Sequence, residues 1–134
     1  MEYKKHPERR LRHFISVPFI YLMIIPLIIF DMSLEIYHHI CFRLYKIPII
    51  KRKNYIRIDR HKLKYLSFFG KINCAYCGYA NGLVNYAVKI AGDTEKYWCA
   101  IKHKDYQGFI PPKHQRNFLN YGDEKSFKRK YKRP

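Results

Sequence analysis

The most regular feature of the chain is an apolar run near its N-terminus. From Phe14 to Phe30 there are 17 residues without a charge. A helix of this length covers about 26 Å, against roughly 30 Å of membrane hydrocarbon. Pro18 and Pro26 each remove a backbone hydrogen bond and are expected to bend the helix. The run predicts a membrane-associated helix, and the alternative is a buried core helix in a soluble protein.

A second pattern follows between Leu34 and Ile47. Apolar side chains recur there on one helical face and polar side chains on the other, which is typical of an amphipathic helix at a headgroup layer or on a partner. Pro48 is expected to end this helix. Across both segments, the side chains expected to contact the membrane are Phe14, Phe19, Tyr21, Leu22, Ile25, Leu27, Phe30, Tyr37, Ile40 and Leu44.

The remaining chain predicts three shorter helices and a disordered tail. Capping residues and glycine stops place the helices at Arg60–Phe69, Ala75–Ala91 and Glu95–Lys104, with Gly70 and Gly92 ending the first two. The predicted fold class is mostly α, with N-terminal membrane-associated helices and a small helical lobe clamped by a metal. The expected parts are a basic flank (1–13), the membrane-associated helices (14–50), the lobe (51–120) and a basic tail (121–134).

The net charge of the chain indicates an acidic partner. The 134 residues include 27 Lys and Arg but only 10 Asp and Glu, a formal net charge of +17. Such an excess favours anionic lipid, nucleic acid or an acidic protein surface. The last ten residues carry six basic side chains, whose repulsion is expected to leave the tail disordered. The predicted contacts to an anionic surface are Arg9, Arg10, Arg12, Lys51, Arg52, Lys53, Lys128, Arg129 and Lys130.

The positions of the basic flanks also predict an orientation. Basic residues lie on both sides of residues 14–50, while Asp31 and Glu35 lie between them. Because cytoplasmic loops carry the excess of Lys and Arg, both flanks are expected in the cytoplasm. A helical hairpin or a re-entrant insertion satisfies this rule. The lobe that follows would then also lie on the cytoplasmic side.

Candidate chemistry is concentrated in four residues. Cys74 and Cys77 form C-x2-C, and Cys99 and His103 form C-x3-H after a gap of 21 residues. Two short pairs of soft ligands suit one tetrahedral zinc ion, and i,i+4 spacing would place the second pair on one helix face. An iron–sulfur cluster that includes Cys41 remains an alternative. A thioredoxin-like redox pair at the C-x2-C motif is another.

A resemblance supports treating these four residues as a set. The stretches NCAYCGYANGLVNYAVKIAGDTEKYWCAIKHK and VPFIYLMIIPLIIFD, with the neighbourhood of Asp59, are similar to a family of small uncharacterised bacterial membrane-associated proteins. Members share an apolar N-terminal region and the same C-x2-C…C-x3-H spacing. The resemblance covers roughly residues 10–105 and implies that the four ligands act together, but it implies no reaction.

Together these features predict a binding or assembly protein at an anionic membrane, with a structural zinc ion. The sequence has no phosphate-binding glycine loop, no H-E-x-x-H and no G-x-S-x-G, so an enzyme is not the favoured class. A thiol redox or iron–sulfur electron-transfer protein and a nucleic-acid-binding zinc module remain alternatives. A role as one subunit of a membrane-protein complex fits the same observations.

Overall fold

The computed structural model describes residues 2–131. This part of the chain is mostly helical, as predicted, and contains no β-strand beyond one isolated bridge. It divides into two compact units, Met1–Tyr86 and Ala87–Pro134.

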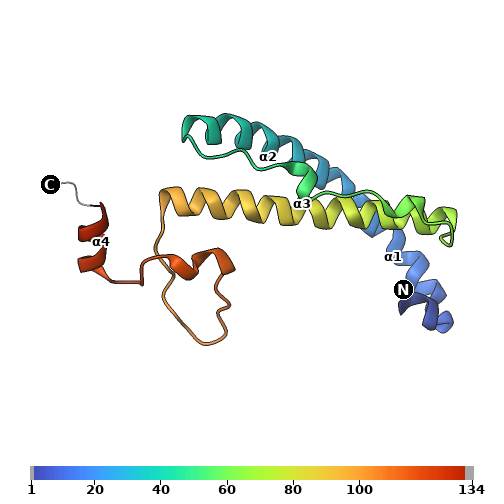
Figure 1. The fold of residues 1–134 in the computed structure, drawn as a ribbon. Coiled ribbons are helices and arrows are strands. Elements are labelled where there is room, and N and C mark those ends of the chain that lie inside the picture. The colour runs from blue at the N-terminus through green and yellow to red at the C-terminus, as the bar shows by residue number, and fades with distance from the viewer. Residues whose placement is uncertain (1, 132–134) are drawn as a thin grey trace. The chain divides into compact units, whose positions relative to one another are not determined.

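The first unit begins with two nearly continuous helices after short 3-10 turns. They are α1 (Arg10–Leu22) and α2 (Ile24–Leu44), shown in Figure 1. The helices part at Met23 because Pro26 has no amide hydrogen for the carbonyl group of Leu22, four residues earlier. Pro18, by contrast, lies inside α1 without ending it.

The predicted separation of the apolar run from an amphipathic helix is wrong. α2 runs without a break through Asp31 and ends at Leu44, three residues before the expected end. The chain does not reverse within residues 14–44. Its reversal follows Leu44, where Lys46 adopts a left-handed backbone conformation with a φ of 56°.

Residues 45–67 then return along α2 as an irregular segment, which we call the strap (Figure 1). Its only regular elements are two short 3-10 turns, η3 (Arg52–Asn54) and η4 (Arg60–Lys62). The predicted helix over residues 60–69 is therefore wrong. The next helix begins only at Phe68, so Gly70 lies in its first turn rather than after its end.

Two glycines of the next helix, α3 (Phe68–Trp98), let the strap lie directly against it. A Cβ atom on Gly82 would be 2.7 Å from the carbonyl oxygen of Tyr55, and one on Gly78 would be 2.8 Å from that of Arg57. Both are backbone contacts far below van der Waals distance. Glycine is therefore required at both positions for the strap to pack between α2 and α3.

The predicted helix break at Gly92 is also wrong, because α3 continues through it to Trp98. A Cβ atom on Gly92 would lie 3.0 Å from the ring of His114. The glycine therefore admits a neighbouring side chain rather than ending a helix. Residues 99–112 are irregular, and residues 95–98 belong to α3, so the separate helix predicted over residues 95–104 is absent. Cys99 and His103 therefore do not share a helix face.

The second unit contains the last turns of α3, an irregular loop, the 3-10 helix η5 (Lys113–Asn117) and α4 (Glu124–Tyr131). Glu95 of α3 accepts a hydrogen bond from the Gln115 side chain at 2.6 Å and also pairs with His114. An isolated parallel bridge joins Ile101 to Leu119. These contacts fix η5 and the loop to the end of α3.

The expected disorder of the tail is overturned where the structure describes it. Residues 124–131 form α4, and residues 132–134 lie outside the described part. Asp123 precedes the helix and its Oδ1 accepts the Ser126 amide hydrogen at 3.0 Å, which caps the first turn. Glu124 forms an i,i+4 ion pair with Lys128. A cap and a local carboxylate thus offset the repulsion among the basic side chains.

The cap of α4 should be lost in acid. The bond from the Ser126 amide lowers the pKa of Asp123 below its ordinary value of 3.8. A lowered pKa means that stabilisation is complete above pH 3.8 and disappears as the pH falls through the folded-state value. We expect the Ser126 amide resonance to titrate with a midpoint below pH 3.8 in NMR spectra. In Asp123→Asn, which can cap but does not titrate, that resonance should stay constant.

Candidate functional site

The first candidate site is an exposed apolar surface on α1 and the first half of α2. Phe14 is 77 % exposed, Phe19 68 % and Ile25 55 %. The segment Pro7–Leu44 is long and apolar enough to cross a membrane, and none of its most apolar 18-residue window is buried. The surface, called the apolar surface below, consists of Leu11, Phe14, Ile15, Val17, Phe19, Ile20, Leu22, Met23, Ile25, Ile28, Ile29 and Phe30.

Most of the residues predicted to contact a membrane are exposed. Seven of the ten have exposed side chains, namely Phe14, Phe19, Leu22, Ile25, Phe30, Ile40 and Leu44. The other three, Tyr21, Leu27 and Tyr37, are half-buried. Tyr21 donates a hydrogen bond to the side-chain oxygen of Asn73 in α3, so it joins two helices of the first unit.

A cluster of polar side chains joins α2, the strap and α3 beyond the apolar surface. Both guanidinium Nη atoms of Arg52, in the strap, bind the two carboxylate oxygens of Asp31, with 2.6 Å for the Nη2 bond. Nη1 also binds Glu35 at 3.0 Å. The Tyr79 hydroxyl of α3 donates to Asp31 at 2.8 Å. This two-pronged geometry is among the stronger ion-pair arrangements.

The cluster continues through a buried histidine. The amide of Ile50 donates to Nε2 of His38 at 3.1 Å, so this nitrogen must carry a lone pair. The neutral ring then has its proton on Nδ1, which faces the hydroxyl oxygen of Tyr86 at 2.9 Å. The Glu35 carboxylate also acts electrostatically on the Tyr86 hydroxyl. Asp31, Glu35, His38, Arg52, Tyr79 and Tyr86 form what we call the polar cluster.

Electrostatics keep the donors of the polar cluster protonated. The hydrogen bond to Asp31 raises the pKa of Arg52 further above its ordinary range. Burial raises the pKa of Tyr86 to about 12, and the Glu35 carboxylate adds to this effect. Burial, followed by the bond to Asp31, also raises the pKa of Tyr79. At neutral pH the cluster is thus a fixed network of donors and acceptors that holds three segments together.

Arg52 therefore differs from the other residues predicted to contact an anionic surface. Its guanidinium is held by Asp31 and Glu35, whereas Arg9, Arg10, Arg12, Lys51, Lys53, Lys128, Arg129 and Lys130 are exposed. The polar cluster was not predicted from the sequence, although a signal was present. Asp31, Glu35 and His38 follow i, i+4, i+7 spacing, which places them on one face of a helix.

Replacing Arg52 should destabilise the first unit. In Arg52→Met, the carboxylates of Asp31 and Glu35 would face each other without a cation. Asp31 is only 13 % exposed but Arg52 is 36 % exposed. The expected decrease in the free energy of unfolding is therefore about 2 kcal/mol, between the values for surface and buried ion pairs. Thermal unfolding in a mild non-ionic detergent, followed by circular dichroism, would measure it. Lys53→Met, at the exposed neighbouring residue, should leave the transition unchanged.

The structure also gathers one His/Glu group that can be considered for a metal ion. Ligand atoms of Glu35, His38 and His39 lie within 4.8 Å of one another. However, both nitrogens of His38 are engaged, by the Ile50 amide and by Tyr86. Glu35 is bound by Arg52 as well. A metal ion would have to displace these partners, so the group is better explained as part of the polar cluster.

The four predicted zinc ligands lie in two pairs, one pair in each unit. Cys74 and Cys77 lie one turn apart in α3, in the first unit, while Cys99 and His103 follow the end of α3, in the second. No group of metal-ligating atoms within 4.8 Å contains them among the described residues. One zinc ion shared by these four residues therefore stays a prediction.

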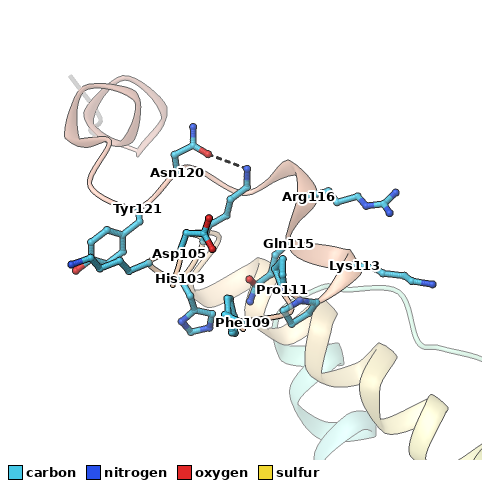
Figure 2. Close-up of a pocket in the computed structure, with 12 residues that line it drawn as sticks. His103, Asp105, Phe109, Pro111, Lys113, Gln115, Arg116, Asn120 and Tyr121 are labelled. Carbon is cyan, nitrogen blue, oxygen red and sulfur yellow. Dashed lines mark hydrogen bonds between the residues drawn. The ribbon is translucent and has the colours of Figure 1, made fainter. Parts of the chain in front are cut away.

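His103 instead borders an open hollow of about 810 Å³ in the second unit. Its ring meets Phe109 edge-on, with centroids 5.6 Å apart. Figure 2 shows Asp105 and Asn120 around the same hollow, with Lys102 bonded to Asn120 at 3.0 Å. The lining includes four cationic side chains, Lys102, Lys104, Lys113 and Arg116. The second unit thus adds basic surface around this hollow.

Comparison of the chain with protein-family models, curated proteins and solved structures finds no match. The family resemblance drawn from the sequence therefore stays a prediction.

Proposed function

We propose that this protein associates with membranes through the apolar surface of α1 and α2 and has a binding or assembly role at anionic lipid. The observation that carries the proposal is the exposure of that surface. A helix that is apolar on all sides belongs in a protein core or in lipid. Here the fold covers none of its most apolar window, so lipid is the environment that would remove these side chains from water.

The charge distribution supports an anionic bilayer as the partner. Arg9, Arg10 and Arg12 precede the apolar surface, and Lys51 and Lys53 follow α2, all with exposed side chains. Each basic residue near an anionic surface adds about 1 kcal/mol of attraction. Arg52 meanwhile pairs with Asp31 and Glu35, which follow the apolar surface in α2, and offsets one of their two negative charges. This pairing lowers the cost of placing this part of α2 near lipid.

The other elements of the sequence-based prediction remain predictions. The cytoplasmic side of the lobe rests on the distribution of Lys and Arg. Zinc held by Cys74, Cys77, Cys99 and His103 would require the chain between the two pairs to leave the regular helix. The proposed membrane function does not depend on zinc, on an iron–sulfur cluster or on nucleic acid, and it is compatible with other membrane-protein subunits as partners.

Flotation of the full chain with lipid vesicles tests the proposal. The protein is exchanged from non-ionic detergent into vesicles of phosphatidylcholine alone or with phosphatidylglycerol. We expect it to float with both, because the apolar surface inserts, and to bind the anionic vesicles more tightly at low salt. A variant with Arg9, Arg10 and Arg12 changed to Gln should lose only the preference for anionic lipid. Protein that remains at the bottom of both gradients as a soluble species would contradict the proposal.

A further inference from the structure

α3 carries a second exposed face, opposite the face that packs on α2 and the strap. Its members follow alternating spacings of three and four residues: Cys74, Cys77, Asn81, Val84 and Val88. Cys74 is half-buried, Cys77 and Asn81 are exposed, and Val84 and Val88 are 49 % and 58 % exposed. Leu83, Tyr86 and Ile90, on the other side of the same helix, are buried. We call the exposed face the seam.

The spacing of the seam is that of a coiled coil. Alternating intervals of three and four residues are the a and d positions of a heptad repeat, whose side chains insert between those of a second helix. Cys74, Asn81 and Val88 occupy a positions. A β-branched residue at a favours two strands, and a single Asn at a fixes the register of a parallel pair. The pattern thus specifies the kind of helix that would cover it.

Charge makes the seam the part of α3 where two copies can meet. The chain has a net charge of +17, so most of its surface repels another copy. Between Lys71 and Lys89, however, α3 has 17 consecutive residues, Ile72–Val88, without a charge. The residues beside the seam are small or uncharged, including Ala80 and Asn85. A second α3 can therefore approach along this stretch without bringing cations together.

Cys74 and Cys77 could form half of a zinc site that a second copy of the chain would complete. Side chains at i and i+3 on a helix have Cβ atoms about 5–6 Å apart, too far for a disulfide within one regular helix. Cys74 and Cys77 are free thiols that can supply two of the four ligands of a tetrahedral zinc ion. In a parallel pair, each a and d residue faces its own equivalent. The same two cysteines of a second copy would then supply the other two ligands.

We propose that two copies of this chain pair in parallel along the seam and bind one zinc ion through Cys74 and Cys77 of each copy. Binding converts four thiols into thiolates, releases four protons to solvent and changes no oxidation state. A parallel pair also directs both apolar surfaces toward the same bilayer. That last support rests on the proposed membrane function, whereas the metal site and the seam do not.

Metal stoichiometry and mass in non-ionic detergent test the pairing without a membrane. We expect purified full-length protein, supplied with zinc under reducing conditions, to form a dimer by light scattering with about one zinc ion per two chains by mass spectrometry of the metal. Cys74→Ser with Cys77→Ser should lose at least nine-tenths of the zinc. Cys99→Ser with His103→Asn should keep the full content, because these residues lie outside the seam.

A substitution in the seam that leaves every cysteine in place tests whether zinc binding depends on pairing of the two copies. Val84→Arg puts two cations face to face in the seam and should yield a monomer with little zinc. The matched change at an exposed residue outside the seam, Tyr97→Arg, should preserve both the dimer and its bound zinc. One zinc ion per chain that requires Cys99 and His103 would overturn the proposal in favour of a clamp within one chain. A zinc-free monomer of the unaltered chain would also overturn it.

Discussion

Replacing Ile25 with Asp should weaken membrane binding by about 100-fold. Ile25 lies in the first turn of α2, is 55 % exposed and belongs to the apolar surface. A charged residue in the middle of a membrane helix costs about 3 kcal/mol relative to water, and loss of the isoleucine adds to this cost. Binding to vesicles of phosphatidylcholine, measured by flotation over a range of lipid concentrations, would give the change in partition coefficient.

The same substitution at Ile110 is the matched control. Ile110 is 87 % exposed but lies in the irregular loop of the second unit, outside the apolar surface. Ile110→Asp should therefore bind vesicles as the unaltered chain does. If both variants lose binding equally, net charge rather than the apolar surface controls association. Helicity in detergent should be unchanged in both, since neither side chain is buried.

Replacing Gly82 with Ala should destabilise the first unit by about 2 kcal/mol. Alanine is the better helix former by about 1 kcal/mol, so helix propensity alone predicts that the substitution stabilises the protein. The new Cβ atom, however, would stand 2.7 Å from the carbonyl oxygen of Tyr55 and 2.8 Å from the Cα atom of Ile56. Both are backbone atoms and cannot rotate away, so the strap must move. Overpacking of this kind costs about 1–3 kcal/mol. Any shift of Arg52 with the strap would also weaken its bonds in the polar cluster and add to this cost.

Asn85→Ala provides the control for helix propensity. Asn85 lies one turn from Gly82 in α3, and its side chain is exposed. The substitution should raise stability slightly or leave it unchanged. Hydrogen exchange would locate the effect, because Gly82→Ala should speed exchange at the Ile50 amide, which donates to buried His38. Protection at Ile50 equal to that of the unaltered chain would show that the strap tolerates a side chain at this position.

The sequence predicts the features that depend on local pattern. An uncharged run predicts the apolar helix, and the absence of alternating strands matches a mostly helical chain. The structure then exposes Phe14, Phe19 and Ile25 on that helix. These properties belong to single segments and need no knowledge of their neighbours.

What the sequence does not reveal depends on contacts between distant segments. Gly82 and Gly92 look like helix breakers, yet each sits inside α3 to admit another segment, the strap in one case and His114 in the other. Arg52 looks like one of many surface cations until Asp31 and Glu35 are seen to face it. No local signal in the sequence distinguishes the single helix α3 from the two shorter helices that were predicted.

The depth of α1 in a bilayer tests the central claim most directly. Trp98 is the only tryptophan, so Phe19→Trp in a Trp98→Phe background places a single fluorophore on the apolar surface. In vesicles whose lipids carry bromine on the acyl chains, we expect blue-shifted emission that is strongly quenched. Emission typical of water, unaffected by the brominated lipids, would show that the apolar surface does not enter the membrane.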